Sequence, residues 1–160
     1  MSIEAPDTEA AGAVADLWVK LAREQHAFGS HLRAEANRAT IREAVVRDII
    51  ADGLLVAREE GEIVGFVMFG PDAERFEQDV SRGVVRNIVV RPDYRNAGIG
   101  AELLATAEAK LAESGFDVVS LSALYENRAA RRFYARAGYE PHRIDLEKRL
   151  ESDTDKPERR

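Results

Sequence analysis

The sequence contains no cysteine. That absence excludes a disulfide framework, a cysteine-ligated zinc site and every enzyme class whose covalent nucleophile is a thiol. Long apolar runs are missing too, since no stretch approaches the roughly 18 residues that cross a bilayer. Residues 1–18 hold four acidic residues and no basic one, so the positive region of a signal peptide is lacking. We therefore predict a cytoplasmic protein that has no membrane partner.

Basic residues are outnumbered, with 23 Lys and Arg against 29 Asp and Glu and a net charge of -6. An acidic chain argues against nucleic-acid binding, which favours a basic surface. Segment 86–136 differs, because its eight basic and six acidic residues give +2 and leave -8 for the rest of the chain. A local basic region suits a small bound polyanion. Ordinary scatter of charge accounts for the pattern equally well.

Histidine is rare as well, with three residues in the chain. Two of them, His26 and His31, are five residues apart, which is not a recognised metal-ligand spacing, so we predict no metal site. Both flank the bend expected between the first two helices. We interpret them as solvated surface side chains.

The length of 160 residues is that of one domain, and 45% hydrophobic with 32% charged residues is typical of a globular protein. Apolar residues recur at helical or strand spacing up to about Leu150. The last ten residues are polar and have no apolar period. We predict a single domain over 1–150 and a flexible tail over 151–160.

Periodicity and turn residues predict an α/β chain with the element order ααββ followed by βαβαβ. Segment 84–121 should form a right-handed parallel crossover. Thr8 is the expected N-cap of the first helix. The expected helices are about 8–24, a region after 30 that ends at about 50, 98–114 and 127–137, and the expected strands are 54–58, 62–69, 84–90, 116–121 and 143–150.

One segment that bears on function lies between a strand and a helix and reads Arg-Pro-Asp-Tyr-Arg-Asn-Ala-Gly-Ile-Gly from Arg91 to Gly100. Gly98 and Gly100 place no side chain where the helix begins, so its first backbone N–H groups are free to bind a phosphate. Glycines at a helix start also serve packing alone. The segment matches neither the dinucleotide-binding glycine pattern nor the P-loop.

A second segment, starting at Asn127, forms the expected last helix. Asn127 and Tyr134 are seven residues apart, so they lie on one stripe of that helix with Ala130 between them. A polar amide and a phenol on one face suit a ligand site. The alternative is that Asn127 only caps the helix and that Tyr134 is a core aromatic residue.

Together these two segments resemble the GCN5-related N-acetyltransferase (GNAT) superfamily. The resemblance rests on Val-Arg-Pro-x-Tyr followed by Arg95-x-x-Gly98-x-Gly100, and then on Asn127-x-x-Ala130-x-x-Phe133-Tyr134. It covers about a third of the chain specifically. It implies an α+β acyl-CoA N-acyltransferase fold, whose mixed, mostly antiparallel sheet is splayed between its two central parallel strands.

The resemblance also implies acetyl-CoA as co-substrate and a primary amine as acceptor. It assigns Tyr134 to the thioester sulfur and Asn127 to the cofactor arm. The pantetheine arm would run beside a strand, and the pyrophosphate would bind backbone N–H groups at the helix start. The residues implied are Ile88, Val89 and Val90 for the arm, and Arg95, Asn96, Ala97, Gly98, Ile99, Gly100 and Ala101 for the pyrophosphate.

These implied roles are chemically consistent. A thioester is already activated, so an amine can attack it directly and catalysis reduces to positioning, oxyanion support and proton movement. We expect the Val89 N–H to polarise the carbonyl. A phenol has a pKa of about 10 and a thiol one of about 8.5, so Tyr134 is better suited to hydrogen-bond the departing thiolate than to protonate it fully.

The strand over 84–90 departs from many relatives because it offers Arg86 and Asn87 but no carboxylate to act as base. Glu126, Asp79, Glu77 or a chain of waters are the open alternatives. An α-amine, with a pKa of about 7.7, is substantially neutral near pH 7, whereas a lysine-like amine at about 10.4 is not. A low-pKa amine is therefore the favoured acceptor.

Other interpretations stay open. The chain can be a CoA-binding sensor or interaction module without turnover, or it can transfer a longer acyl group. Three arginines of the last helix either reach coenzyme phosphates or are solvated. A homodimer through the strand 143–150 is a further alternative. The three arginines are Arg128, Arg131 and Arg132.

Overall fold

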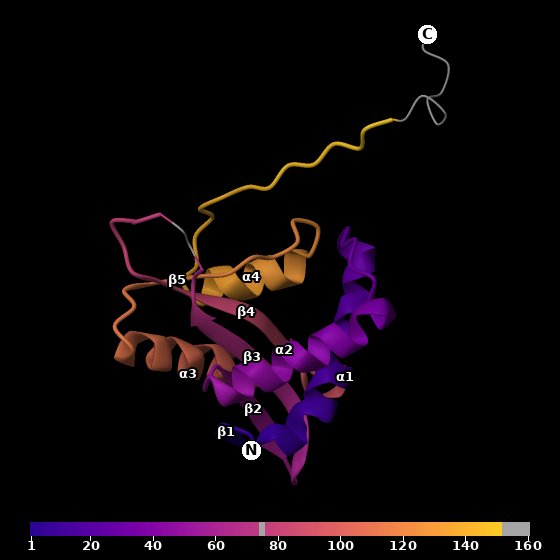
Figure 1. Ribbon diagram of the computed structural model, residues 1–160, viewed down its shortest axis with the longest axis vertical. Helices are drawn as coiled ribbons and strands as arrows, with labels where there is room; N and C mark the ends of the chain where they lie inside the picture. The colour runs from indigo at the N-terminus through magenta and orange to yellow at the C-terminus, as the bar shows by residue number, and fades with distance from the viewer. Residues whose placement is uncertain (74–75, 152–160) are drawn as a thin grey trace.

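A five-stranded sheet organises the protein in the computed structural model, which describes residues 1–73 and 76–151 (Figure 1). The strand order is β1-β2-β3-β4-β5. Neighbours pair antiparallel except β4 and β5, which are parallel. The strands are β1 (Ser2–Glu4), β2 (Leu54–Glu59), β3 (Glu62–Pro71), β4 (Arg82–Val90) and β5 (Val118–Ser120).

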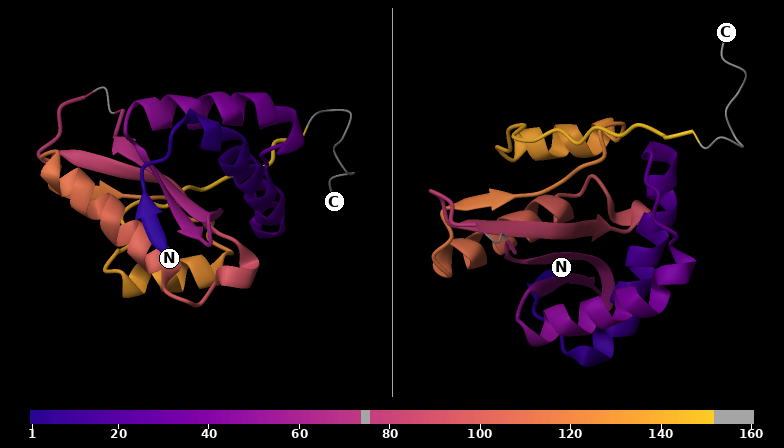
Figure 2. Two further views of the ribbon diagram at one scale, coloured as in Figure 1. Left: turned by 90° about the horizontal axis from the view of Figure 1, so that it is seen from below. Right: turned by 45° about the horizontal axis from the view of Figure 1, so that its top comes forward.

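Helices cover both faces of this sheet (Figure 2). On one face α1 and α2 bury Val14 and Val45 against Phe66 of β3. On the other face lies α3, together with the aromatic rings of α4. The helices are α1 (Ala11–Gln25), α2 (Arg38–Ile50), α3 (Ile99–Glu113) and α4 (Arg128–Arg136).

The helix α3 builds a second apolar cluster against the sheet. It buries Leu103, Ala107 and Leu111, which repeat at the helical spacing that the sequence predicts. Phe133 and Tyr134 of α4 pack against the same cluster. The sheet is therefore a central layer between two apolar clusters, with α1 and α2 on one side and α3 and α4 on the other.

Local sequence signals explain most of these elements. Glu60 and Gly61, at φ 49° and 82°, form the tight turn between β2 and β3, which confirms the predicted hairpin. Gly115 ends α3 and Gly138 ends α4, both with positive φ, as expected for glycine after a helix. The predicted crossover from β4 through α3 to a parallel β5 is confirmed as well.

The structure differs from the predictions at the N-terminus in two ways. Thr8 does not cap α1, because residues Thr8–Ala10 form a 3-10 turn whose own cap is Asp7, the side chain of which accepts a hydrogen bond from Glu9 N at 3.0 Å. In addition, Ser2–Glu4 forms β1 on the edge of the sheet, which was not predicted. Three residues are too few to give a strand periodicity.

The predicted last strand is also absent from the described structure. Residues 139–151 contain neither helix nor strand, and 143–150 are exposed. The sheet therefore ends at β5, which pairs with β4 alone. Of the predicted tail over 151–160, all but its first residue lies outside the described residues, and the domain boundary at 150 stays a prediction.

Candidate functional site

Strands β4 and β5 run side by side over a short distance only. The pairs are Arg82 with Val118, Gly83 with Val119 and Val84 with Ser120. From Val85 to Val90, β4 has no strand partner on that side within the described residues. A stretch of β4 backbone is therefore left without strand hydrogen bonds on one side.

The direction of each N–H in this stretch follows from one hydrogen bond. Arg91 N donates to Val64 O at 2.8 Å, which points the Arg91 N–H toward β3. Because backbone N–H groups alternate in direction along a strand, the Val89 N–H also points toward β3. The N–H groups of Ile88 and Val90 point toward the unpaired side. The Val89 N–H is thus turned away from the open side, and our expectation that it polarises a carbonyl there is wrong.

The start of α3 follows directly. Pro92–Tyr94 forms a 3-10 turn, and Asn96 and Gly98 have φ of 63° and 85°. None of residues 96–101 donates its backbone N–H to another described residue, and Gly98 provides no side-chain cap. The first backbone N–H groups of a helix are usually hydrogen-bonded to a capping side chain or to water. Several unpaired N–H groups together with the positive end of the helix dipole favour the binding of an anion.

Arg95 differs from its neighbours because its groups are already engaged. Its N–H donates to Pro92 O at 3.4 Å, and its Nε donates to Val90 O at 2.9 Å. Its Nη2 lies 3.4 Å from a carboxylate oxygen of Glu24 in α1. Arg95 therefore ties the turn to β4 and α1, and its predicted contact with a cofactor stays a prediction.

The two glycines serve different purposes. A Cβ on Gly98 would meet nothing within 4 Å, so its positive φ is what requires glycine there. A Cβ on Gly100 would lie 3.4 Å from the Phe133 ring and 3.7 Å from Val90 Cγ2. Gly100 therefore lets α4 and β4 approach the start of α3 closely.

Asn127 begins α4 as its N-cap. Its Oδ1 accepts a hydrogen bond from Ala130 N at 3.1 Å. The Nδ2 group donates to no described residue. The capping interpretation is thus confirmed, and the amide N–H2 remains available to a ligand.

Tyr134 lies on the same helix, half-buried against Phe133 and Tyr139 at ring-centroid distances of 5.2 and 6.1 Å. Its hydroxyl makes no hydrogen bond with a described residue. Burial raises the pKa of the Tyr134 phenol above 10, so the group stays protonated at neutral pH. A protonated phenol without a partner can donate a hydrogen bond to a ligand.

The neighbouring Tyr139 provides a contrast. Its hydroxyl donates to Glu108 Oε2 at 2.6 Å. Burial and this hydrogen bond raise the pKa of Tyr139 well above its usual range. Of the two phenols, only that of Tyr134 is free for a ligand.

The positions of the three predicted base candidates in the structure do not support a role as the general base. Glu77, Asp79 and Glu126 are all exposed, and none is hydrogen-bonded to Tyr134. Sequence reasoning missed a different acid, Asp48 at the end of α2. Its Oδ2 is buried without a hydrogen bond and lies 3.6 Å from Nη1 of Arg86.

Burial raises the pKa of Asp48, and the charges of Arg86 and Arg47 oppose that rise. Arg86 also donates to Pro71 O at 3.2 Å. Gly70 makes room for this guanidinium, because a Cβ there would lie 2.9 Å from Nη1. A register shift at this point of the β3–β4 ladder leaves Arg86 without an opposite residue on β3.

The remaining predicted residues lie at the periphery. His26 Nε2 is 2.7 Å from Leu32 O, and His31 Nε2 is 2.9 Å from Glu147 Oε1. Arg131 stacks 4.4 Å from the Tyr125 ring and donates to Tyr125 O. Within residues 1–73 and 76–151, no three His, Asp or Glu side chains gather as a metal site would need.

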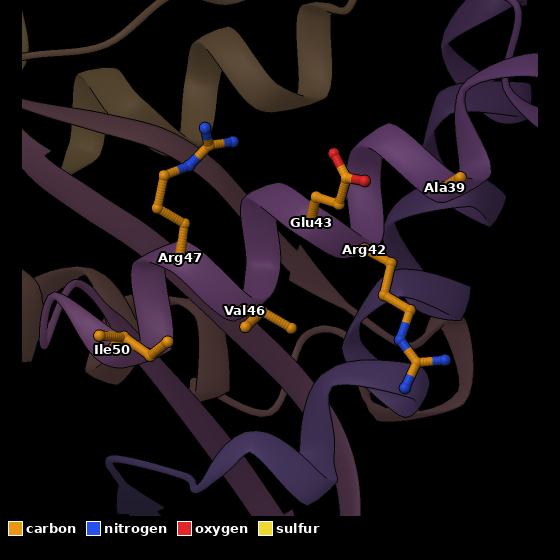
Figure 3. Close-up of a pocket in the computed structure, with 6 residues that line it drawn as sticks. All are labelled: Ala39, Arg42, Glu43, Val46, Arg47 and Ile50. Atoms are coloured by element: carbon orange, nitrogen blue, oxygen red, sulfur yellow. The ribbon is translucent and has the colours of Figure 1, made fainter.

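A shallow hollow on the outer face of α2 is separate from these groups (Figure 3). Arg42 and Arg47 point in different directions along its rim. The sheet lies between α2 and the layer of α3 and α4, so the hollow takes no part in the site. Its lining residues are Ala39, Arg42, Glu43, Val46, Arg47 and Ile50.

Residues 16–139 match the family model described as the Acetyltransferase (GNAT) family. An acetyltransferase of Pectobacterium atrosepticum is 37% identical over 103 residues, which are 64% of this chain and 68% of that protein. The aminoalkylphosphonate N-acetyltransferase of Salmonella typhimurium is 32% identical over 95 residues, 59% of this chain and 61% of that protein. The chain thus spans about three fifths of the length of the first curated relatives.

Solved structures share the fold. A GCN5-related N-acetyltransferase from Ralstonia eutropha has a TM-score of 0.71 at 24% identity, covering 93% of this chain and 97% of that one. An aminoglycoside 6'-N-acetyltransferase from Acinetobacter haemolyticus has a TM-score of 0.73 at 13% identity, with 96% and 100% coverage. Among the described residues, no helix is long and apolar enough to cross a membrane.

Proposed function

This chain belongs to the Acetyltransferase (GNAT) family, and from that membership we propose that it transfers an acetyl group from acetyl-CoA to a primary amine. The amine attacks directly in a ternary complex. One observation carries the proposal: the unpaired N–H groups of 96–101 lie beside the unpaired end of β4, since a Cβ on Gly100 would be 3.7 Å from Val90 Cγ2. Such a row of donors suits an extended ligand that ends in a diphosphate.

The backbone N–H groups from Asn96 to Ala101 hold the pyrophosphate in this proposal. Ile88, Val89 and Val90 line the pantetheine arm, where β4 and β5 separate. Since Arg95 occupies the Val90 carbonyl, the groups of β4 left for the arm and the thioester together are the Val90 N–H and both polar backbone groups of Ile88. The amide of Asn127 donates to the arm from the other side.

Acetyl-CoA, when bound, supplies an acetyl group that is already activated as a thioester. The Ile88 N–H replaces Val89 as the donor to the carbonyl oxygen, because it faces the unpaired side. The Tyr134 hydroxyl donates to the departing sulfur. Its raised pKa makes it a hydrogen-bond donor rather than an acid that transfers its proton fully.

The acceptor amine follows from the absence of a carboxylate on β4. An amine that is largely neutral near pH 7 needs no strong base, so an α-amine of a peptide or a small-molecule amine of low pKa is the proposed acceptor. The similarity to an aminoalkylphosphonate N-acetyltransferase supports a small-molecule amine as the acceptor. The predicted cytoplasmic location belongs to the same proposal.

An amine panel with mass detection of the acetylated product tests the function. A peptide with a free N-terminus is compared with an N-blocked peptide that contains lysine, at neutral pH. We expect faster acetylation of the free N-terminus or of a small low-pKa amine. A preference for lysine contradicts the proposed acceptor class, and acetyl-CoA binding without thiol release for any amine supports the sensor alternative.

A further inference from the structure

Arg86 lies where strands β4 and β5 separate. The last residue of β4 that pairs with β5 is Val84, and from Val85 onward β4 has no strand partner on that side within residues 1–73 and 76–151. Arg86 is therefore two residues beyond the last pair. It is also two residues before Ile88, the proposed donor to the thioester carbonyl. Residues two apart on a strand are separated by about 7 Å, so Arg86 is close to the proposed reaction centre.

The side chain of Arg86 lies on the face of the sheet that α1 and α2 cover. Its Nη1 is 3.6 Å from Oδ2 of Asp48 in α2. Asn87 faces the same way, because Val89, two residues further along the strand, is buried among residues of α1 and α2. Tyr134 packs on the opposite face with α3. A cofactor that contacts Tyr134 therefore leaves the α2 face of β4 to the second substrate.

The guanidinium of Arg86 is held in place, but most of its donors are free. Nη2 donates to Pro71 O at 3.2 Å, whereas Asp48 Oδ2 accepts no hydrogen bond from any described residue. A guanidinium has five N–H donors, so most of those of Arg86 have no partner in the described part of the chain. The side chain is 40% exposed. A fixed guanidinium with free donors favours a carboxylate, phosphate or phosphonate group.

The local charge favours an anion as well. Both Arg86 and Arg47 act on the carboxyl group of Asp48. Two arginines outweigh one acid, so the surroundings of Arg86 attract a further negative charge. The Asp48 carboxylate competes with that charge, because it lies beside the same guanidinium.

We propose that Arg86 binds an anionic group of the acceptor, so that the substrate is a small amine that also carries a carboxylate, phosphate or phosphonate. This assignment rests on the proposed acetyl transfer. The amine lies beside the carbonyl bound by Ile88, and the anion lies at the guanidinium, about 7 Å away along the strand. A dipeptide or a short aminoalkyl acid covers that span. The charge-assisted contact orients the amine toward the thioester.

Matched pairs of acceptors test the proposal. Glycylglycine has a carboxylate that glycylglycinamide lacks, and aminoethylphosphonate is compared with its uncharged diethyl ester. Each compound offers one primary amine, and thiol release from acetyl-CoA gives kcat/KM. We expect the parent to prefer the anionic member of at least one pair by about tenfold or more. The pair that shows the preference identifies the kind of anion.

Two variants at this position should change the preference in opposite directions. Arg86→Met removes the guanidinium and should lower the preference for the anionic acceptor about 10- to 100-fold. Asp48→Asn removes the competing carboxylate and should raise the preference about threefold or more. The matched control is Arg82→Met, because Arg82 also lies beside an acid, Asp72 at 3.9 Å, but in the paired part of β4. It should keep the preference of the parent.

Calorimetry separates a failure of this proposal from a failure of the proposed function. The anionic acceptor is titrated into protein saturated with CoA, while thermal unfolding and acetyl-CoA binding show that each variant is folded. Binding that is lost in Arg86→Met, without thiol release for any amine, supports the anion site and overturns acetyl transfer.

Three outcomes overturn the anion site and leave acetyl transfer standing. The first is equal turnover of the anionic and uncharged members of both pairs by the parent. The second is a preference for the anion that survives in Arg86→Met. The third is a preference that falls in Asp48→Asn as it does in Arg86→Met, because the ion pair would then act through the folded structure alone.

Discussion

Two helices of this protein begin in opposite ways. α3 starts at Gly98, which has φ 85° and no capping side chain, and the N–H groups of residues 96–101 have no partner among the described residues. α4 starts at Asn127, whose side chain accepts from Ala130 N. One start is left open to a ligand, whereas the other is closed by its own sequence.

The difference shows that the start of α3 is suited to binding an anion, whereas the start of α4 is suited to fixing the position of its side chains. Glycine at the N-cap position costs only about a few tenths of a kcal/mol relative to a capping side chain, so α3 gives up little stability at Gly98. In return, its donors need no displacement when an anion binds. The capped α4 instead holds Tyr134 at a fixed position, seven residues after its cap.

The largest expected effect comes from closing the open start. Gly98→Glu forces a residue with a Cβ into positive φ and adds a negative charge beside the donors. We expect acetyl-CoA affinity to fall about 100-fold or more, measured by calorimetry. Gly115→Glu is the matched control, because Gly115 also has positive φ and open space but lies at the other end of α3. Equal losses in the two variants would mean that strain alone acts.

Removing the phenol tests the capped helix next. Tyr134→Phe should lower kcat about 10- to 100-fold, the value of a hydrogen bond to a charged group, with little change in the KM for acetyl-CoA. Thiol release measures both constants. Tyr139→Phe serves as the control, since that hydroxyl is bound to Glu108. An unchanged kcat in Tyr134→Phe removes Tyr134 from the mechanism.

Two variants of Asn127 distinguish its role as a helix cap from its proposed contact with the ligand. Asn127→Asp keeps a capping oxygen but loses the amide donor, so affinity for acetyl-CoA should fall about 5- to 10-fold while stability is retained. Asn127→Ala should also lose about 1 kcal/mol of stability. Urea unfolding and calorimetry measure the two effects. Unchanged affinity in Asn127→Asp would show that Asn127 is a cap only.

The smallest effect is expected away from both helix starts. The raised pKa of Asp48 means that the folded state holds this proton more tightly than the unfolded chain. Stability from this group is complete at low pH and is lost as the pH rises from the unfolded value, near 3.8, through the folded one. Relative to the parent, Asp48→Asn should therefore gain stability as the pH rises.

Urea unfolding of both proteins at several pH values checks that prediction, with acetyl-CoA affinity as the control. We expect the affinity to stay unchanged, because Asp48 lies on the α2 face of the sheet, opposite α3 and α4. A stability difference that is constant with pH would contradict the effect of burial on Asp48. A loss of affinity would place Asp48 in the binding site.

Sequence alone determined the parts of this protein that depend on neighbours along the chain. The β2–β3 turn, the end of α3 at Gly115 and the cap at Asn127 each require a residue type within a few positions, so local rules suffice. The glycines of the α3 start and the stripe from Asn127 to Tyr134 are local in the same sense.

Only the tertiary structure decided the features that depend on strand register or on distant segments. Ile88 rather than Val89 faces the unpaired side of β4 because the pairing with β3 fixes the direction of each N–H. Asp48 meets Arg86 across 38 positions of sequence. Segment 143–150 has the alternating pattern of a strand. Such a pattern specifies which face of the strand is apolar and favours burial, but it does not specify which sheet edge the strand pairs with.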